Sequence, residues 1–196
     1  MALTLAYESG QTPLDPDEAA QLIPTHLTTQ RDLDEWEQTN ILEAQKWLKR
    51  RRQLRVFTEA FCRELHRRMF DQTWQWAGKF RTSDKNIGCP SEQVAMRLRL
   101  LLDNTDYQLN AGHLVALDEV AARFHHALLL VHPFPNGNGR HARLMTDTLL
   151  RSRSAEPFSW GSRNLDATGE ARTQYIGALK AADSGDMGPL LGFVRS

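Results

Sequence analysis

The sequence predicts a mainly α-helical domain that carries one small β-hairpin. Apolar residues recur at three- and four-residue steps along most of the 196-residue chain, which is the spacing of amphipathic helices. The pattern changes between Trp74 and Pro90, where two short runs flank a turn at residues 84–86 and indicate a hairpin. The length suits one ordinary domain with a hydrophobic core and an additional arm.

The order of the expected elements follows from breakers and caps. Residues 1–14 are expected to be irregular because Gly10 and Pro13 interrupt them, and Asp15 then caps a short helix that runs to about residue 23. The spacing of Leu33, Trp36 and Asn40 predicts a helix over about 32–50. Further helices are expected over about 56–69, 94–102, 117–131, 138–150 and 168–182, with a short terminal piece over 187–193. We therefore expect residues 1–50 to form an N-terminal arm with helices and residues 51–196 to form the core domain.

Composition excludes several classes of partner. Lys plus Arg equals Asp plus Glu at 24 each, so no net charge attracts nucleic acid or an anionic membrane. Residues 46–55 are basic, but Glu43 and Glu59 flank them, and such a run is more often a solvated helix face than a nucleic-acid site. We expect no direct nucleic-acid binding.

Nothing in the sequence indicates export or membrane insertion. The two cysteines, Cys62 and Cys89, form no disulfide framework. The first residues lack the basic and apolar regions of a signal peptide, and no apolar stretch approaches the roughly 20 residues that span a bilayer. A reduced, cytoplasmic protein is expected.

The segment from 132 to 143, HPFPNGNGRHAR, carries the strongest chemical signal. A buried apolar helix ends at His132, because Pro133 and Pro135 forbid its continuation. Gly137 and Gly139 allow the backbone to approach a ligand closely, and a new helix begins at once. The free N–H groups and the positive end of that helix make an anion site, for which phosphate is the natural occupant.

The polar residues of this segment suit phosphate chemistry. Arg140 and Arg143 lie on one face of the new helix near its positive end, where cations are unfavourable unless a polyphosphate lies between them. His132 stands beside the site as a candidate general base, and Phe134 would hold the loop against the core. A single histidine after a helix is more often a cap, and two arginines usually serve the surface. The combination within twelve residues favours the functional interpretation.

At these residues the chain resembles the Fic family, whose signature is H-x-F-x-[D/E]-G-N-G-R-x-x-R. The residues that match are His132, Phe134, Gly137, Asn138, Gly139, Arg140 and Arg143. The resemblance extends over roughly residues 50–195. The wording of the motif and the lead-in LDEWEQTNILEAQKW are similar to the subfamily called mobile mystery protein B, whose members are typically encoded beside a helix-turn-helix protein on mobile elements.

The resemblance implies a Fic-type helical bundle that transfers AMP from ATP to a Ser, Thr or Tyr hydroxyl of a target protein. His132 would deprotonate the hydroxyl. The nucleotide-binding set would be Phe134, Gly137, Asn138, Gly139, Arg140 and Arg143, in which Asn138 and the two glycines form the anion hole and the arginines hold the β- and γ-phosphates. The hairpin near 80–89 would align the target segment, with Ile87 as its apolar clamp.

One residue departs from the family pattern. Asn136 stands where the family has Asp or Glu, the ligand of Mg²⁺. An amide oxygen can still bind the ion, but Mg²⁺ prefers a charged ligand. Weaker metal binding, altered nucleotide use or a different reaction therefore stays open.

The resemblance also implies a built-in inhibitory helix with the pattern [S/T]-x-x-x-E-[G/N]. Thr39 and Glu43 nearly fit it and lie one turn apart on the helix expected over 32–50. The hypothesis is that Glu43 restrains Arg143, while a surface ion pair is the plainer interpretation of this glutamate.

Three functions follow in order. The first is protein adenylylation with ATP and Mg²⁺, perhaps as the toxin-like half of a two-gene module. The second is a nucleotide-binding regulatory module that acts with a helix-turn-helix partner. The third is another phosphate-group transfer on the same scaffold. A homo-oligomer is compatible with all three.

Overall fold

The computed structural model describes residues 12–51, 54–110, 115–162, 165 and 169–196. The α-helices in these ranges are α1 (Pro16–Ala19), α2 (Gln30–Lys49), α3 (Glu59–Phe70), α4 (Val94–Asn110), α5 (Leu117–Val131), α6 (Asn138–Ser152), α7 (Glu170–Asp183) and α8 (Gly188–Val194), with 3₁₀ turns at Ser91–Gln93 and Trp160–Ser162. The prediction of a mainly α fold is confirmed. No helix in the described ranges combines the length and the apolar character needed to cross a membrane.

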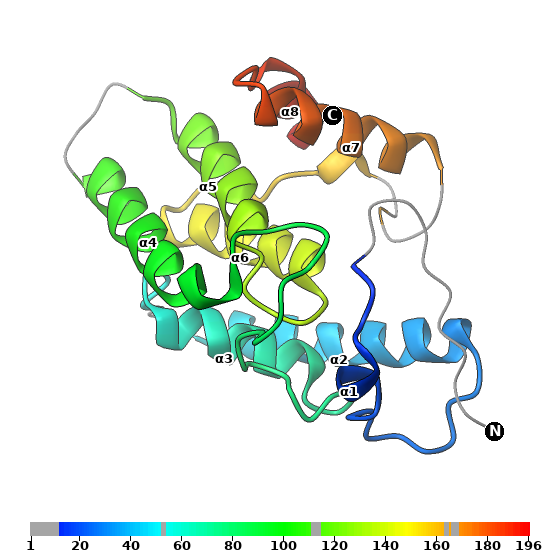
Figure 1. The fold of residues 1–196 in the computed structure, drawn as a ribbon. Coiled ribbons are helices and arrows are strands. Elements are labelled where there is room, and N and C mark those ends of the chain that lie inside the picture. The colour runs from blue at the N-terminus through cyan, green and yellow to red at the C-terminus, as the bar shows by residue number, and fades with distance from the viewer. Residues whose placement is uncertain (1–11, 52–53, 111–114, 163–164, 166–168) are drawn as a thin grey trace.

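Helices α5 and α6 form the centre of the molecule (Figure 1). They pack against each other through side chains with almost no exposed surface, among them Leu128, Met145 and Leu149. Helices α2 and α3 pack together on one side of this pair, and α7 and α8 pack together on the other. The loop between α5 and α6 therefore lies between α2 and α7, and these two helices flank the pocket described below.

Local capping explains where two of these helices begin. The Thr29 side chain accepts a hydrogen bond from the Asp32 N–H, and the Asp32 carboxylate accepts one from the Thr29 N–H at 3.0 Å, a capping box that starts α2. The Thr58 side chain caps α3 by accepting from the Phe61 N–H. Both caps satisfy N–H groups that would otherwise lack a partner.

Residues 79–90, which we call the flap loop, form an irregular loop and not the predicted hairpin. The Arg81 guanidinium donates to the carbonyl oxygens of Ser83 and Cys89, so a side chain bridges the two arms where a hairpin would use a backbone ladder. Gly88 has φ 116°, and a Cβ on it would lie 2.6 Å from the Cβ of His132. The loop is therefore packed directly against the end of α5.

Candidate functional site

The backbone at His132 ends α5 in a left-handed conformation, with φ 50° and ψ 62°. Its N–H still donates to the carbonyl of Leu128 at 3.1 Å, and Pro133 prevents the helix from continuing. This turn places the imidazole at the edge of the pocket, where Nε2 lies 2.9 Å from the hydroxyl oxygen of Thr12.

The loop from 133 to 137 is shaped by its own side chains. The Asn138 side chain accepts from the Phe134 N–H at 3.0 Å and donates to the Phe134 carbonyl at 2.7 Å. His66 of α3 accepts from the Gly78 N–H at 3.0 Å, which leaves its Nε2 to donate to the Asn136 carbonyl at 3.1 Å. Phe134 itself is fully buried and stacks on His66 with ring centroids 3.7 Å apart. Phe134 and the Asn138 side chain thus fix the loop, and the backbone at the start of α6 faces the ligand space.

Gly137 begins α6 at a position that accepts no larger residue. Its φ is 75°, and an added Cβ would lie 2.6 Å from the Phe70 ring. The glycine therefore allows the chain to turn directly into α6, whose first N–H groups lack intrahelical acceptors and face the pocket.

Arg81 holds the flap loop and the end of α5 together. Its buried guanidinium donates to the His132 carbonyl at 2.6 Å and to the Val131 carbonyl at 3.4 Å, in addition to its bonds within the flap loop. A cation at the C-terminal end of a helix is favourable, and here it also satisfies otherwise orphaned carbonyls. The same charge faces the imidazole of His132.

His132 is held in its neutral form. Burial, together with the positive charges of Arg81 and Lys85, lowers the pKa of His132 to about 4, against a hydrogen bond with the Leu129 backbone that acts in the other direction. At neutral pH the ring is therefore unprotonated and can accept a proton at Nε2.

Three further histidines near the site are buried in the neutral form. Burial lowers the pKa of His125 to about 3 and that of His141 to about 4, and it lowers the pKa of His66 well below its usual value. An unfolded histidine titrates near 6.5, so below that pH the unfolded chain binds more protons than the folded one. The stability contributed by these histidines and His132 is complete above about pH 6.5 and is lost as the pH falls toward 4.

We expect the free energy of unfolding to drop between pH 7 and pH 5 by roughly 2 kcal/mol for each of the four histidines. Burial raises the pKa of Asp147 to about 6, so this one carboxyl acts in the opposite direction and offsets part of the loss. Urea unfolding followed by tryptophan fluorescence at several pH values measures the slope. The exposed variant His26→Gln should leave it unchanged, and a stability that is flat or rising toward pH 5 would contradict the assignment.

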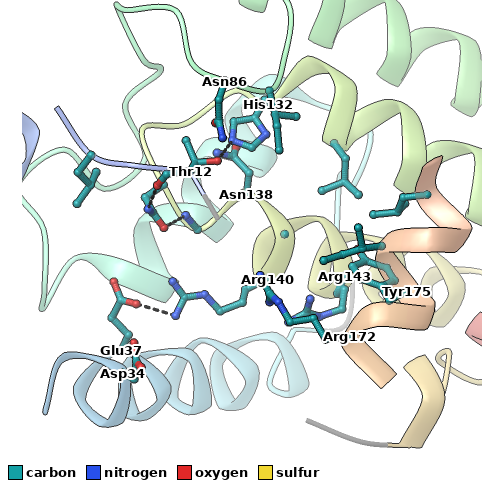
Figure 2. A pocket seen from close by; sticks show the side chains of 18 of the residues that line it. Thr12, Asp34, Glu37, Asn86, His132, Asn138, Arg140, Arg143, Arg172 and Tyr175 are labelled. Carbon is teal, nitrogen blue, oxygen red and sulfur yellow. Dashed lines mark hydrogen bonds and ion pairs between the residues drawn. The ribbon is translucent and has the colours of Figure 1, made fainter. Parts of the chain in front are cut away.

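Arg140 and Arg143 both reach the pocket from α6, as the spacing predicts (Figure 2). Arg140 lies over the Phe70 ring, and its guanidinium forms an ion pair of 2.6 Å with the Glu37 carboxylate from α2. Glu37 is buried, and its other oxygen accepts from the Trp74 indole at 2.6 Å. The glutamate is therefore fixed on both oxygens and neutralises the first of the two motif arginines.

The expected contact of Glu43 with Arg143 is not what the structure shows. Glu43 is 62% exposed and pairs with Lys46 at 2.6 Å, while the Thr39 hydroxyl donates to the carbonyl of Glu35 on the outer face of α2. Six residues along a helix correspond to a rotation of about 600°, so Glu43 and Glu37 lie on different faces. The face of α2 that packs inward carries Leu33, Glu37, Asn40, Ile41, Ala44 and Leu48.

The side chain of Asn136 is engaged by protein groups. Its Nδ2 donates to the carbonyl of Thr12 at 2.9 Å, and its Oδ1 accepts from the Gly137 N–H at 2.5 Å. Among the described residues no group of three or more His, Cys, Asp or Glu side chains could hold a metal ion. The donor set around Asn136 therefore does not fit a protein-held Mg²⁺, and no step below depends on one.

The pocket has a volume of about 1210 Å³, large enough for a ligand of nucleotide size. Helix α2 closes one end with Asp34 and Glu37, and α7 closes the other with Arg172 and Tyr175 (Figure 2). Ile87 of the flap loop lines the pocket and is 37% exposed. The structure brings together His132, Gly137, Asn138, Gly139, Arg140 and Arg143 in its wall.

Four residues of the site have roles that the sequence analysis did not assign. His66 and Arg81 were noted only as landmarks of the resemblance, and their buried positions could not be read from spacing. Glu37 could have been found, because it lies four residues from both Leu33 and Ile41 on the buried face of α2. Thr12 lies in a segment without periodicity, so no signal pointed to it.

The fold and the site together define a class: a helical domain in which a neutral histidine faces a helix start that carries two arginines. Residues 56–150 match the model of the Fic/DOC family. The chain therefore contains a Fic/DOC family domain.

Similar proteins with curated names carry the name protein adenylyltransferase Fic. The chain is 31% identical over 134 residues to that of Drosophila virilis and 32% identical over 134 residues to that of Drosophila melanogaster. Each alignment covers 67% of this chain and 26% of the relative, so the chain spans about a quarter of the length of these proteins.

Solved structures share the fold. A variant of Fic-1 from C. elegans aligns with a TM-score of 0.67 and 25% identity, over 91% of this chain and 51% of that one. The BepC protein of Bartonella tribocorum, solved with bound AMPPNP, aligns with a TM-score of 0.69 and 18% identity, over 92% of this chain and 97% of its own.

Proposed function

We propose that this protein is a protein adenylyltransferase that transfers AMP from ATP to a hydroxyl side chain of a target protein. The observation that carries the proposal is a neutral histidine whose Nε2 contacts a hydroxyl at 2.9 Å, beside a helix start with two arginines. The names of the relatives and the AMPPNP bound to BepC support ATP as the donor.

Each part of the site has one role in this reaction. His132 takes the proton of the target hydroxyl, whose oxygen attacks the α-phosphorus of ATP. The bond from that phosphorus to the bridging oxygen breaks, and pyrophosphate leaves. The first N–H groups of α6 stabilise the charge at the α-phosphate, while Arg140 and Arg143 bind the β- and γ-phosphates. Asn138 and Phe134 keep the loop in shape, and Ile87 contacts the target segment.

Labelling of proteins in a cell lysate tests the reaction class. With ATP labelled at the α-phosphorus, proteins should acquire label, and peptide mass spectrometry should locate AMP on Ser, Thr or Tyr. Label that enters proteins only from the γ-phosphorus would assign phosphoryl transfer in place of AMP transfer. Nucleotide binding without any transfer would favour the regulatory binding module.

Glu37 restrains the site in this proposal, with residues 1–50 as the regulatory arm and residues 51–196 as the catalytic core. Arg140 cannot bind phosphate while it is paired with a buried carboxylate, so the resting enzyme binds ATP weakly. Glu37→Gln removes the charge and keeps an oxygen for the Trp74 indole. We expect this variant to bind ATP roughly 5-fold or more tightly and to transfer AMP faster, as isothermal titration and α-label transfer would measure.

Glu43→Gln is the matched control for this prediction. It makes the same chemical change on the same helix, at an exposed residue that pairs only with Lys46 among the described side chains. Its ATP affinity should equal that of the wild type. An effect of Glu43→Gln that equals or exceeds the effect of Glu37→Gln would return the restraint to the residue expected from the sequence.

Narrower assignments belong to the same proposal. The motif wording and the lead-in over 33–47 support the mobile mystery protein B subfamily, and with it a helix-turn-helix partner, a toxin-like role and a cytoplasmic location. Mg²⁺ would enter with the phosphates of ATP, since the Asn136 side chain is engaged elsewhere. Co-purification with the neighbouring gene product tests the partner, and sedimentation tests a homo-oligomer.

A further inference from the structure

The hydroxyl that contacts the candidate base belongs to the chain itself. Thr12 lies 120 residues before His132, yet its Oγ1 lies 2.9 Å from His132 Nε2, and the contact is buried (Figure 2). A hydroxyl on the free nitrogen of a neutral imidazole is the arrangement from which a proton is abstracted. Thr12 thus occupies the position that the proposed reaction requires of an acceptor.

The segment that carries Thr12 is held against the flap loop by charged groups. The Asp15 carboxylate accepts from the Ser83 hydroxyl at 2.6 Å and from the Lys85 ammonium at 2.8 Å. Lys85 also pairs with Glu18 at 2.5 Å, and its side chain is only 3% exposed. A buried ammonium between two carboxylates is a specific contact, so the position of the segment is defined by more than the hydroxyl.

The backbone of Thr12 is fixed by the residue that departs from the family pattern. The carbonyl of Thr12 accepts from Asn136 Nδ2 at 2.9 Å. An amide can donate this hydrogen bond, whereas the Asp or Glu of the family signature, when ionised, has no proton to donate. Asn136 therefore serves the chain's own N-terminal segment at a point where a charged metal ligand would repel the carbonyl.

We propose that Thr12 is a self-modification site, at which the protein attaches AMP to its own N-terminal segment. The inference rests on the proposed adenylyltransferase function. Oγ1 of Thr12 attacks the α-phosphorus of ATP as His132 Nε2 takes the hydroxyl proton. The new phosphorus–oxygen bond joins AMP to Thr12, the bond to the bridging oxygen breaks, and pyrophosphate leaves with the electron pair. The modified oxygen can no longer donate to His132, so the contact seen here is lost in the product.

The test uses purified full-length protein with α-labelled ATP and Mg²⁺, without lysate, in the wild-type and Glu37→Gln backgrounds. We expect one AMP per chain, located on Thr12 by peptide mass spectrometry. The first-order rate constant should not change over a tenfold range of protein concentration, because acceptor and base belong to one molecule. Thr12→Ser should retain label at this position, and Thr12→Val should lose it. Thr28→Val, at an exposed threonine outside the pocket, should be labelled like its parent.

Two results would overturn the inference, and they separate it from the proposed function. If lysate proteins are labelled through His132 while the Thr12 peptide stays unmodified, the segment only blocks the site and the adenylyltransferase function stands. If neither lysate proteins nor Thr12 acquire label in either background, the proposed function fails together with the inference. Urea unfolding midpoints of the Thr12 variants show that a loss of label is not a loss of fold.

Discussion

Replacing His132 with asparagine is expected to abolish AMP transfer and to leave ATP binding intact. Asparagine tolerates the left-handed backbone found at this residue and can accept a hydrogen bond, but it cannot take up the hydroxyl proton. Because a positioned general base contributes roughly 10²- to 10⁴-fold, the rate of α-label transfer should fall by that factor.

Binding and transfer are measured on the same preparations, so that the two effects separate. The ATP dissociation constant of His132→Asn should match that of the parent, since the phosphate-binding groups lie on α6. His26→Asn, at an exposed histidine, serves as the control and should transfer at the parental rate. A His132→Asn variant that transfers AMP at an undiminished rate would exclude His132 as the base.

Arg81→Met is expected to cause the largest loss of stability. The guanidinium is fully buried and donates to the carbonyls of Val131 and His132 as well as to the flap loop. Methionine fills much of the same volume but leaves these acceptors without donors, at roughly 1–3 kcal/mol for each buried group. We expect the free energy of unfolding to fall by on the order of 3 kcal/mol or more. Transfer should also be lost, because the end of α5 and the flap loop separate.

Arg123→Met on α5 is the matched control. Arg123 is 54% exposed and pairs with Glu119 one turn away, an arrangement worth only about 0.3–0.5 kcal/mol. Chemical denaturation of the two variants beside the wild type compares their unfolding free energies. Equal losses for Arg81→Met and Arg123→Met would show that the buried guanidinium does not hold the loop.

The elements that the sequence defined well are those with strong local punctuation. The expected bounds of α5 agree with the structure, because Pro133 and Pro135 end one helix and Gly137 starts the next. The motif loop, its arginines and its histidine were located for the same reason. Local signals suffice where a steric rule fixes the backbone at a single residue.

The prediction for α2 was correct about the helix and wrong about its inward face. The pattern of Leu33, Trp36, Asn40 and Trp47 suggested a stripe centred on large aromatics. Trp36 is 37% exposed, and the buried stripe runs through Glu37, which the pairing with Arg140 and Trp74 makes acceptable inside. A buried carboxylate is recognisable only with its partners, and these are far away in the sequence.

The remaining parts of the site depend on contacts between distant segments. The flap loop lacks a ladder because Arg81 satisfies its carbonyls, and nothing in the spacing of residues 79–90 distinguishes that solution from a hairpin. Thr12 reaches His132 across 120 residues, from a segment without periodic pattern. Such contacts are a property of the tertiary structure, and sequence patterns alone do not contain them.

The central claim is that the chemistry at His132 moves AMP, and a double-label experiment tests it most directly. The Glu37→Gln variant is incubated with target proteins and ATP that carries different isotopes at the α- and γ-phosphorus. The account predicts that the α-label enters protein hydroxyls and that the γ-label is recovered in pyrophosphate in equal amount. Recovery of the γ-label in protein, or of both labels in unreacted ATP despite tight binding, would contradict it.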